Sequence, residues 1–551
     1  MLVRTIATLG GLAGAAVLYA GTASAQSLDC TDFTTDAFAI EGLVIDTTEH
    51  VEPDEEAPIA HCRIVGQIDQ RQGIDGMSYA IGFELRLPDD WNGNFVHQFN
   101  GGNDGAIVPA LGELPGSLTA LSQGYAVVSS NAGHMGDAHP DAGLAGGARF
   151  GFDPEARSDY GYSAVAKLNP VATAMVETYY GDDIAHTYGV GRSNGGRHAM
   201  VAAARMPEAF DGLLVGFPGF NLPKAAIQHA WDVQAFKSVS DDIRTAFSQA
   251  DLDLVANAVL SACDGLDGLE DGIIADTDAC QVTFDIDTLQ CAEGQNAQCL
   301  SPIQLEALRT IHAGPTNSAG EQLYAEWAWD RGIASPNWRF WKLESTVPPW
   351  DNMPIIAVMG SASLAQIFST PPVEVDGSPE ALETFLLEYD FDTDSEAIYA
   401  TTEDFPESAM DFMTPPGADD PELAAFRDAG GKMIVYHGVS DPVFSVLDTT
   451  DWYDALNANN GGNADDFVKF YRVPGMGHGH GGTATDSFDA FSALTAWVED
   501  DAEPGPLVAS ATPDNALVPE LAGVTRKLCA YPAVPRYTGG DEASHESFIC
   551  E

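Results

Sequence analysis

The sequence predicts an α/β fold in which a long insertion interrupts a mostly parallel sheet. Short apolar runs typical of strands alternate with helical patterns up to about residue 222, and the same alternation returns at about residue 422. Such alternation is typical of a sheet covered by helices on both faces. The chain has 551 residues, 45% of them hydrophobic and 19% charged, which suffices for a large core and excludes a disordered composition.

The first part of the predicted core covers residues 26–222. It begins with a β-rich alternating segment at 64–87. Later strand-like runs lie at 94–98, 124–130, 187–190 and 211–215, and helical patterns cover 163–180 and 195–206. We expect these strands to share one sheet, with the helices packed against it.

The predicted insertion covers residues 223–421, has the length of an ordinary domain and is expected to form a lid over the core. It contains an Asp/Gly-rich loop, a local Cys pair and a Trp-rich stretch at 327–350, and we expect it to be irregular. The second part of the core, 422–551, contains a helix at 422–429, strands at 433–436 and 467–473, a helix near 487–498 and a tail closed by cysteines.

Residues 1–25 are typical of an export signal. Arg4 supplies the positive start, an apolar stretch covers 6–20, and Ala23-Ser24-Ala25 is a small-residue cleavage site. The alternative, an uncleaved membrane anchor, needs a longer apolar run. We therefore expect a secreted or periplasmic protein after cleavage near Ala25.

The charge balance excludes two classes of partner. The chain carries 82 acidic and 24 basic residues, a net charge of −58. Such a surface repels nucleic acids and anionic membranes, so we expect neither as a partner. Salt-rich surroundings favour this balance because screening weakens the self-repulsion, and a saline habitat is therefore a hypothesis. The sequence does not indicate an oligomeric state.

Eight cysteines in an exported chain indicate disulfide bonds. Eight cysteines allow 105 complete pairings, and proximity in the sequence narrows them. The predicted local pairs are Cys263–Cys280, Cys291–Cys299 and Cys529–Cys550, which leave Cys30–Cys62 by elimination.

Gly191-Arg192-Ser193-Asn194-Gly195 is a G-x-S-x-G motif between a strand-like run and a helical run. In that setting a tight turn presents the Ser193 hydroxyl as a nucleophile, as in α/β hydrolases. The alternative is a Gly-rich surface turn. The strand–turn–helix setting favours the catalytic interpretation.

A serine nucleophile needs a base and a group that orients the base. In α/β hydrolases the acid and then the His follow the Ser along the chain, after later strands. Asp441 follows the strand-like run at 433–436, and His478 is the first His after the run at 467–473, with His480 as its rival. The order Ser193, Asp441, His478 therefore predicts an α/β-hydrolase core.

The oxyanion of an acyl-transfer intermediate needs two N–H donors. One is predicted to be the backbone N–H of Asn194, directly after the nucleophile. The other is predicted to come from the Gly-rich loop at 97–105, at Gly101 and Gly102, for which the alternative is a plain turn.

The segment 263–273 concentrates hard oxygen donors. Carboxylates and carbonyls of such a loop are the ligands that calcium prefers, although the spacing does not fit an EF-hand. The alternative is a solvated acidic loop. The candidate ligands are the carboxylates of Asp264, Asp267 and Asp271 and the carbonyls of Leu269 and Ile273.

Over nearly its whole mature length the chain resembles the tannase and feruloyl esterase family, which also contains mono(2-hydroxyethyl) terephthalate hydrolases. The resemblance implies that Ser193, Asp441 and His478 are nucleophile, acid and base. It also implies a calcium site at the Asp-rich loop of the lid and the three local disulfides. The matching segments are GRSNGGRHAM (191–200), FDPEARSDYGYSA (152–164), CDGLDGLEDGII (263–274), CLSPIQLEALRTIHAGP (299–315), YHGVSDP (436–442), VPGMGHGHGG (473–482) and LCAYPAVPRY (528–537).

One departure from the family pattern lies beside the catalytic residues. The family normally has a Cys before the catalytic Ser and another after the catalytic His, joined by a disulfide, whereas this chain has Arg192 and Gly479. His478 must then be positioned by packing and hydrogen bonds. Arg192 places a cation beside the nucleophile, which either loosens the triad or adapts it to an anionic substrate.

Together these features predict a secreted serine carboxylic ester hydrolase that cleaves esters of aromatic acids through an acyl-enzyme intermediate. Hydroxycinnamate, gallate and terephthalate-type monoesters are the candidate substrates, and the Trp residues of the lid either stack on the acyl group or fill the lid's core. The alternative from another class is a calcium-stabilised extracellular binding protein with a decayed hydrolase site.

Overall fold

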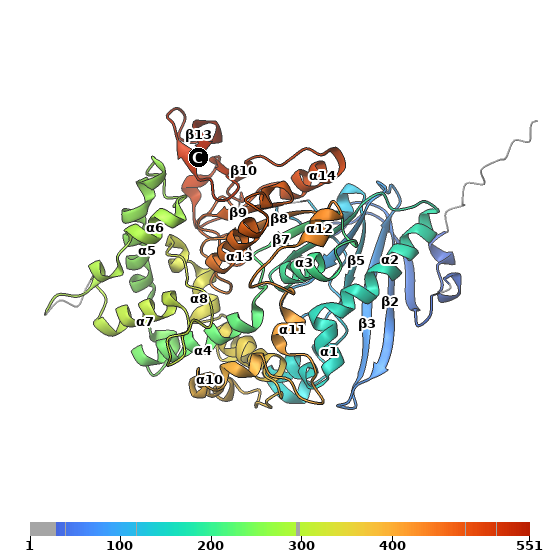
Figure 1. The fold of residues 1–551 in the computed structure, drawn as a ribbon, viewed down its shortest axis with the longest axis horizontal. Helices are drawn as coiled ribbons and strands as arrows, with labels where there is room; N and C mark the ends of the chain where they lie inside the picture. The colour runs from blue at the N-terminus through green and yellow to red at the C-terminus, as the bar shows by residue number, and fades with distance from the viewer. Residues whose placement is uncertain (1–28, 39, 117, 294–297, 480, 514) are drawn as a thin grey trace, which may run out of the picture.

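A computed structural model describes residues 29–551 except 39, 117, 294–297, 480 and 514 (Figure 1). The predicted export signal at 1–25 and the rival base His480 lie outside the described residues. Within the described part of the chain, no helix combines the length and apolar character needed to cross a bilayer.

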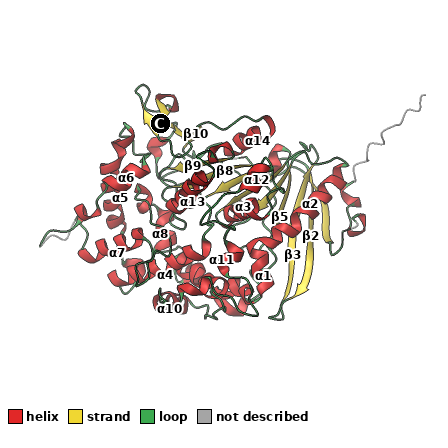
Figure 2. Cartoon of the chain, in the orientation of Figure 1, coloured by secondary structure: helices red, strands yellow, loops and turns green. Residues whose placement is uncertain are grey.

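The core is one nine-stranded mixed sheet with the order β1-β2-β3-β5-β4-β6-β7-β8-β9 (Figure 2). β1, β2, β3 and β5 pair antiparallel, and the strands from β5 to β9 in that order pair parallel. The α/β fold is therefore confirmed. The strands are β1 (Val44–Val51), β2 (His61–Gln72), β3 (Ser78–Pro88), β4 (Phe95–Phe99), β5 (Ala126–Ser130), β6 (Thr187–Arg192), β7 (Gly212–Gly216), β8 (Lys432–Gly438) and β9 (Val468–Val473).

Helices cover both faces of the sheet because successive strand residues point to opposite sides. In β7, Leu213 and Val215 pack against α3 (Asn194–Arg205) and α13 (Val446–Asn459), whereas Leu214 packs against α14 (Ala490–Asp500) on the opposite face. α2 (Ala164–Tyr180) covers β2 to β5. Two shorter helices are α1 (Pro154–Ser158) and α12 (Ala424–Asp428).

The predicted strands and helices of the core are present, most of them within two residues of the expected ends. The small tail strands and α1 were not predicted, and neither were two longer elements, β1 and α13. β1 is mostly exposed, so it has no apolar alternation that marks a strand. α13 buries Val446, Trp452 and Leu456 but has polar and acidic residues between them, which weakened the helical pattern.

The expectation that 223–421 is irregular is wrong, because the segment is largely helical; we call it the helical insertion. Its helix starts were visible as signals: Ser248 and Ser301 form capping boxes, and prolines occupy the first turn of several helices. The helices are α4 (Leu222–Val239), α5 (Gln249–Cys263), α6 (Thr277–Thr283), α7 (Pro302–Ala313), α8 (Pro336–Lys342), α9 (Ser361–Ser363), α10 (Pro379–Glu388) and α11 (Ala409–Met413).

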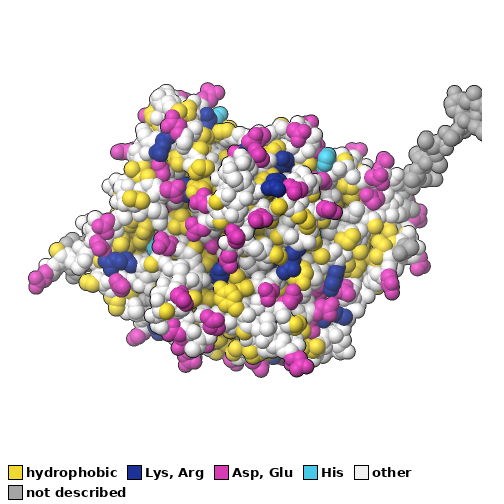
Figure 3. All heavy atoms as spheres, viewed as in Figure 1, with side chains coloured by type: hydrophobic (Ala, Val, Ile, Leu, Met, Phe, Trp, Pro, Cys, Tyr) yellow, Lys and Arg dark blue, Asp and Glu magenta, His cyan; other side chains and the backbone are white. Residues whose placement is uncertain are grey.

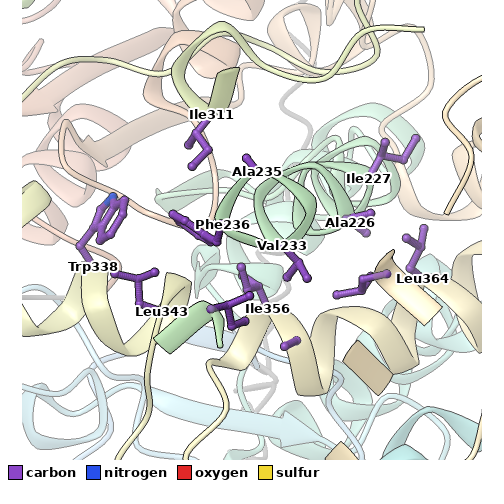
Figure 4. Packing of buried hydrophobic residues seen from close by; sticks show 14 of the residues in the cluster. Ala226, Ile227, Val233, Ala235, Phe236, Ile311, Trp338, Leu343, Ile356 and Leu364 are labelled. Carbon is purple, nitrogen blue, oxygen red and sulfur yellow. The ribbon is translucent and has the colours of Figure 1, made fainter. Parts of the chain in front are cut away.

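The helical insertion has an apolar core that is continuous with the first part of the chain. Figure 4 shows Val233 and Phe236 of α4 packed among side chains of other helices, including Trp338 of α8. The same cluster contains Phe150 and Tyr160, which lie outside the insertion. Because interiors are close-packed, this shared core fixes the insertion against the sheet domain.

Arg157 of α1 forms a second connection between the two parts. Its guanidinium is 1% exposed and donates hydrogen bonds to the carbonyls of Gly151, Gln366 and Ser369 and to the Thr370 hydroxyl, at 2.5 to 3.0 Å. Burial lowers the pKa of Arg157 to about 9, so the side chain is still charged at neutral pH. A buried charge of this kind is tolerated because its donors are satisfied.

Four disulfide bonds join the cysteines in the expected pairs: Cys30–Cys62, Cys263–Cys280, Cys291–Cys299 and Cys529–Cys550. The last of them closes a tail of two small antiparallel pairs. These are β10 (Leu507–Ser510) with β11 (Thr525–Leu528), and β12 (Pro535–Tyr537) with β13 (Phe548–Cys550).

Candidate active site

Ser193 occupies a sharp turn between β6 and α3. Its backbone has a φ of 62°, which is unusual for a residue with a side chain. The turn depends on its glycines, because a Cβ on Gly191 would collide with the Gly195 carbonyl and a Cβ on Gly195 with the Phe99 carbonyl. The sequence therefore folds here into the geometry expected of a nucleophile elbow.

The structure brings Ser193, His478 and Asp441 into one hydrogen-bonded chain. His478 Nε2 lies 2.9 Å from Ser193 Oγ, and His478 Nδ1 lies 2.8 Å from Asp441 Oδ2. Asp441 follows β8 and His478 follows β9, so the parallel register of these strands with β6 brings all three loops to one edge of the sheet.

Asp441 is a buried carboxylate that is held ionised. Its Oδ1 accepts backbone N–H groups of Val443 and Phe444 at 2.7 and 3.1 Å. Burial alone raises the pKa of this carboxyl, but the facing His478 and hydrogen bonds from His437 and His478 outweigh burial, and the net pKa lies well below its usual value. A permanent negative charge therefore faces His478 Nδ1.

His478 is positioned by contacts that the sequence analysis did not predict. Its ring packs edge-on against Phe217, Trp341 and Phe444, with centroids 4.9, 5.0 and 5.4 Å away. Asn337 of α8 clamps its backbone: Oδ1 accepts the His478 N–H at 2.9 Å, and Nδ2 donates to the His478 carbonyl at 3.1 Å. No sequence signal marks Asn337, which acts from the helical insertion. Trp341 lies in the Trp-rich stretch at 327–350, for which the sequence predicted stacking on the acyl group or packing in the lid but not a contact with His478.

The predicted oxyanion loop lies against the nucleophile. Gly101 approaches Ser193 closely, and among the described residues no acceptor is bonded to the backbone N–H of Gly102 or Asn194. A residue of the core holds this loop in place: the Tyr160 hydroxyl donates a hydrogen bond to the Gly102 carbonyl at 3.1 Å. The loop is also fixed by the insertion, where Ser363 exchanges hydrogen bonds with Asn103.

Two cavities meet at Ser193 and His478. The larger, about 620 Å³, lies beneath the helical insertion, and its lining is mainly apolar and aromatic. Its side chains include Leu222, Ala226 and His229 of α4, Trp341 of α8, and Trp350, Val358, Phe368 and Phe444. A cavity of this size and character suits a ligand the size of an aromatic acyl group.

The smaller cavity, about 350 Å³, lies on the other side of the nucleophile and is more polar. Arg192 and Gly479, which stand where the family resemblance calls for a Cys pair, both line it. The Arg192 guanidinium forms an ion pair with Glu113, so its charge is compensated. Gly479 has a φ of 109° and open space at its Cβ position.

The predicted calcium ligands lie together in one loop after α5. Asp264 and Asp267 accept backbone N–H groups of the loop, and Asp271 pairs with Arg526 of the tail. Burial, with repulsion from Asp271 and Asp264, raises the pKa of Asp267 to about 6. Carboxylates are ligands that a hard cation prefers, but Arg526 already engages Asp271, and among the described residues these three are not a group whose oxygens lie within 4.8 Å of one another.

A different acidic cluster satisfies a purely geometric criterion for a metal site. Within the described residues, Asp69, Glu155 and Asp159 place carboxylate oxygens within 4.8 Å of one another. Lys167 Nζ lies at their centre, 2.5 Å from Asp69, 2.9 Å from Asp159 and 3.3 Å from Glu155. The cluster is therefore an ion-pair network that already contains its cation.

Comparison with known proteins identifies the family of this chain. Residues 62–551 match the family model described as "Tannase and feruloyl esterase". A mono(2-hydroxyethyl) terephthalate hydrolase from Piscinibacter sakaiensis is 40% identical over 518 residues, covering 89% of this chain and 84% of the relative. A probable feruloyl esterase from Arthroderma benhamiae is 27% identical, covering 85% and 81%.

The fold has a close counterpart among solved structures. Feruloyl esterase B from Aspergillus oryzae superposes with a TM-score of 0.75 at 20% identity, covering 95% of this chain and 99% of that one. The family match spans nearly the whole described chain and agrees with the segments that suggested it. The chain belongs to the tannase and feruloyl esterase family of carboxylic ester hydrolases.

Proposed function

We propose that this protein is a secreted serine esterase that hydrolyses esters of aromatic acids through an acyl-enzyme intermediate. One observation carries the proposal: the hydrogen-bonded chain of Asp441, His478 and Ser193 opens onto the apolar cavity of about 620 Å³. A nucleophile, a base and a site for an aromatic group are then adjacent, which is the arrangement that acyl transfer requires.

In the acylation step, His478 Nε2 takes the proton of Ser193 Oγ as the oxygen attacks the ester carbonyl carbon. The carbonyl oxygen becomes an oxyanion and accepts hydrogen bonds from the backbone N–H of Asn194 and of the Gly101–Gly102 loop. Asp441 accepts the Nδ1–H of His478 and stabilises the imidazolium. His478 then gives its proton to the alcohol oxygen as the C–O bond breaks.

In the deacylation step, water replaces the alcohol. His478 takes a proton from this water, whose oxygen attacks the acyl carbon, and returns the proton to Ser193 Oγ as the acid leaves. The same oxyanion donors act in both steps, so both barriers depend on the Asn194 N–H and on the loop that Tyr160 and Ser363 hold.

The two cavities divide the ester between them. The acyl group occupies the apolar cavity, whose lining includes the aromatic rings of Trp341 and Phe444, and the alcohol occupies the polar cavity beside Arg192 and Glu113. Residues 26–222 and 422–551 then form the catalytic core and 223–421 the lid that supplies the acyl pocket. Four disulfides and the N-terminal signal pattern support an exported protein.

Calcium is proposed as a structural ion of the lid. Asp264, Asp267 and Asp271 with the Leu269 and Ile273 carbonyls would hold it, and it would neutralise the repulsion among the loop carboxylates. Among the described residues, the loop's hydrogen bonds to other segments go to Arg331, Arg526 and Arg536, and none goes to a triad residue. We therefore assign the ion to stability and not to the reaction.

The test is hydrolysis of methyl ferulate, methyl gallate and mono(2-hydroxyethyl) terephthalate by the full chain and by Ser193→Ala. The 40% identical relative makes the terephthalate monoester the second candidate substrate. We expect turnover that Ser193→Ala abolishes, and fluorophosphonate labelling of the wild type alone. Absence of both turnover and labelling would favour the decayed binding protein.

A further inference from the structure

His229 is a buried polar side chain of the apolar cavity without a hydrogen-bond partner. It lies on α4, is 7% exposed and lines the cavity. Among the described residues, neither of its ring nitrogens has a partner, Nδ1 is fully enclosed, and Gly360 packs against the face of the ring. Nearby polar side chains are satisfied: Asn103 bonds to Ser363, and Asn194 bonds to Asp104 and Arg197.

An enclosed imidazole without a partner loses hydrogen-bonding energy that a bound ligand can restore. Nδ1 is fully enclosed, whereas Nε2 is not among the fully enclosed unpartnered atoms, so the ring edge that reaches the cavity is the one with Nε2. That edge presents one polar atom among aliphatic and aromatic neighbours such as Ile355 and Val358. A single polar atom in an apolar pocket sets ligand orientation and selectivity.

The imidazole is uncharged at neutral pH. Burial, aided by the nearby Lys342, lowers the pKa of His229 to about 3. Lys342 does not reach the cavity as a free cation, because it is 2% exposed and its Nζ lies 2.5 Å from the buried Asp232 carboxylate. A neutral imidazole can exchange a hydrogen bond with a hydroxyl and offers no charge to an anion.

The cavity as a whole is unsuited to an anionic ring substituent. Among the described residues that line it there is no Lys or Arg, and the remaining titratable groups are Asp104, His229 and His478. A carboxylate placed there would lose its hydration without gaining a counter-ion. The net charge of −58, visible as acidic side chains spread over the face in Figure 3, also disfavours the approach of anions.

We propose that His229 recognises a neutral hydroxyl on the aromatic ring of the acyl group, so that the enzyme prefers esters of phenolic acids to monoesters of aromatic dicarboxylic acids. This inference rests on the proposed esterase function and adds its substrate class. It separates this chain from the terephthalate monoester activity named for its 40% identical relative. His229 acts as a specificity residue and takes no part in proton transfer at the ester.

The test uses esters that differ in one ring substituent and share one alcohol. We would compare kcat/KM for 2-hydroxyethyl benzoate, 2-hydroxyethyl 4-hydroxybenzoate and mono(2-hydroxyethyl) terephthalate, with methyl cinnamate and methyl 4-hydroxycinnamate as a longer pair. We expect the hydroxyl to raise kcat/KM about tenfold over hydrogen in at least one set. We expect the carboxylate to lower it at least about tenfold relative to hydrogen.

Two variants assign the preference to His229. His229→Leu keeps the side-chain volume and removes the polar atom. The ratio of kcat/KM for the hydroxylated ester to that for the unsubstituted ester should then fall to about one, while kcat/KM for the unsubstituted ester should change by less than about threefold. His229→Gln places an amide near the former Nε2 and should restore most of the preference. Met359→Leu, another lining residue without a hydrogen-bonding group, is the control and should shift all esters alike.

The outcomes distinguish this inference from the proposed function. If the unsubstituted esters are hydrolysed but the carboxylate ester is the best substrate, or if the hydroxyl preference survives His229→Leu, the inference is wrong and the esterase assignment stands. If no ester reacts and no fluorophosphonate labels Ser193, the proposed function itself fails. Thermal melting of each variant shows whether a loss reflects unfolding, which would lower kcat/KM for every ester together.

Discussion

The active site is built from two regions that position their residues in different ways. Ser193, Asp441 and His478 follow β6, β8 and β9, and the ladder between neighbouring strands fixes where each loop begins. Asn337 and His229 come from helices of the insertion, whose positions depend on packing across a shared apolar core. The difference suggests that the sheet carries the reaction, while the insertion holds His478 in place and selects the acyl group.

The largest effect should come from the sheet side. Asp441→Asn keeps the shape of the side chain but removes the negative charge that faces His478 Nδ1. The Asn amide can also place an N–H opposite the Nδ1–H of His478, so that two donors face each other and the imidazole is no longer held in the catalytic tautomer. We expect kcat to fall about 10⁴-fold. Steady-state kinetics with active-site titration measure it. A loss below tenfold would mean that the His478–Asp441 contact is structural, and the division between sheet and insertion would lose its basis.

The insertion side should show an intermediate effect on rate. Asn337→Ala removes both hydrogen bonds to the His478 backbone, so the imidazole samples unproductive positions, and we expect kcat to fall about 10- to 100-fold with KM nearly unchanged. The rate of fluorophosphonate labelling should fall in parallel, because it reports the same His–Ser pair. Unchanged labelling with a lower melting temperature would instead make Asn337 a purely structural residue.

The polar cavity should contribute a smaller, alcohol-dependent effect. Arg192→Ala and Glu113→Gln each break a partly exposed ion pair beside the proposed alcohol site. Relative to the wild type, we expect kcat/KM for a 2-hydroxyethyl ester to fall about two- to fivefold more than kcat/KM for the methyl ester of the same acid. Hydrolysis of the acyl-enzyme, after the alcohol has left, should be unchanged. Equal losses for both esters, or slower deacylation, would remove the alcohol from this cavity.

The smallest effect should be on stability, at the loop proposed for calcium. Without calcium, the pKa of Asp267 in the folded protein is raised to about 6, whereas in the unfolded chain it is about 4. Between these two pH values the folded protein therefore keeps a proton on Asp267 that the unfolded chain has released. The stability contribution of Asp267 is therefore lost as the pH rises from about 4 to 6. Melting temperatures in a chelator should show this loss for the wild type but not for Asp267→Asn, and added calcium should cancel it. Identical curves with and without calcium would leave the loop without an ion.

Sequence patterns predict the sheet side well because its signals are local. The G-x-S-x-G turn, Asp441 and His478 each follow an apolar run, and the order of the runs suffices to bring the residues to one edge. The cysteine pairs were also readable, since three of the four are close along the chain.

The insertion could not be read in the same way. Its helix starts at Ser248 and Ser301 were visible but were outweighed by the irregular composition around them. The roles of Asn337 and His229 leave no mark in the sequence, because each depends on how a helix far along the chain packs against the sheet domain. An isolated Asn before a Trp and a His inside an apolar helix have many structural explanations.

The buried guanidinium of Arg157 has a consequence for protein engineering. Its hydrogen bonds tie the turn at Gly151 to Gln366, Ser369 and Thr370, so the boundary between the two regions has donors on one side and acceptors on the other. A chimera that exchanges residues 223–421 alone with a relative would leave this charge facing foreign backbone. A chimera that exchanges acyl pockets within the family should therefore replace the segment around Arg157 together with the insertion.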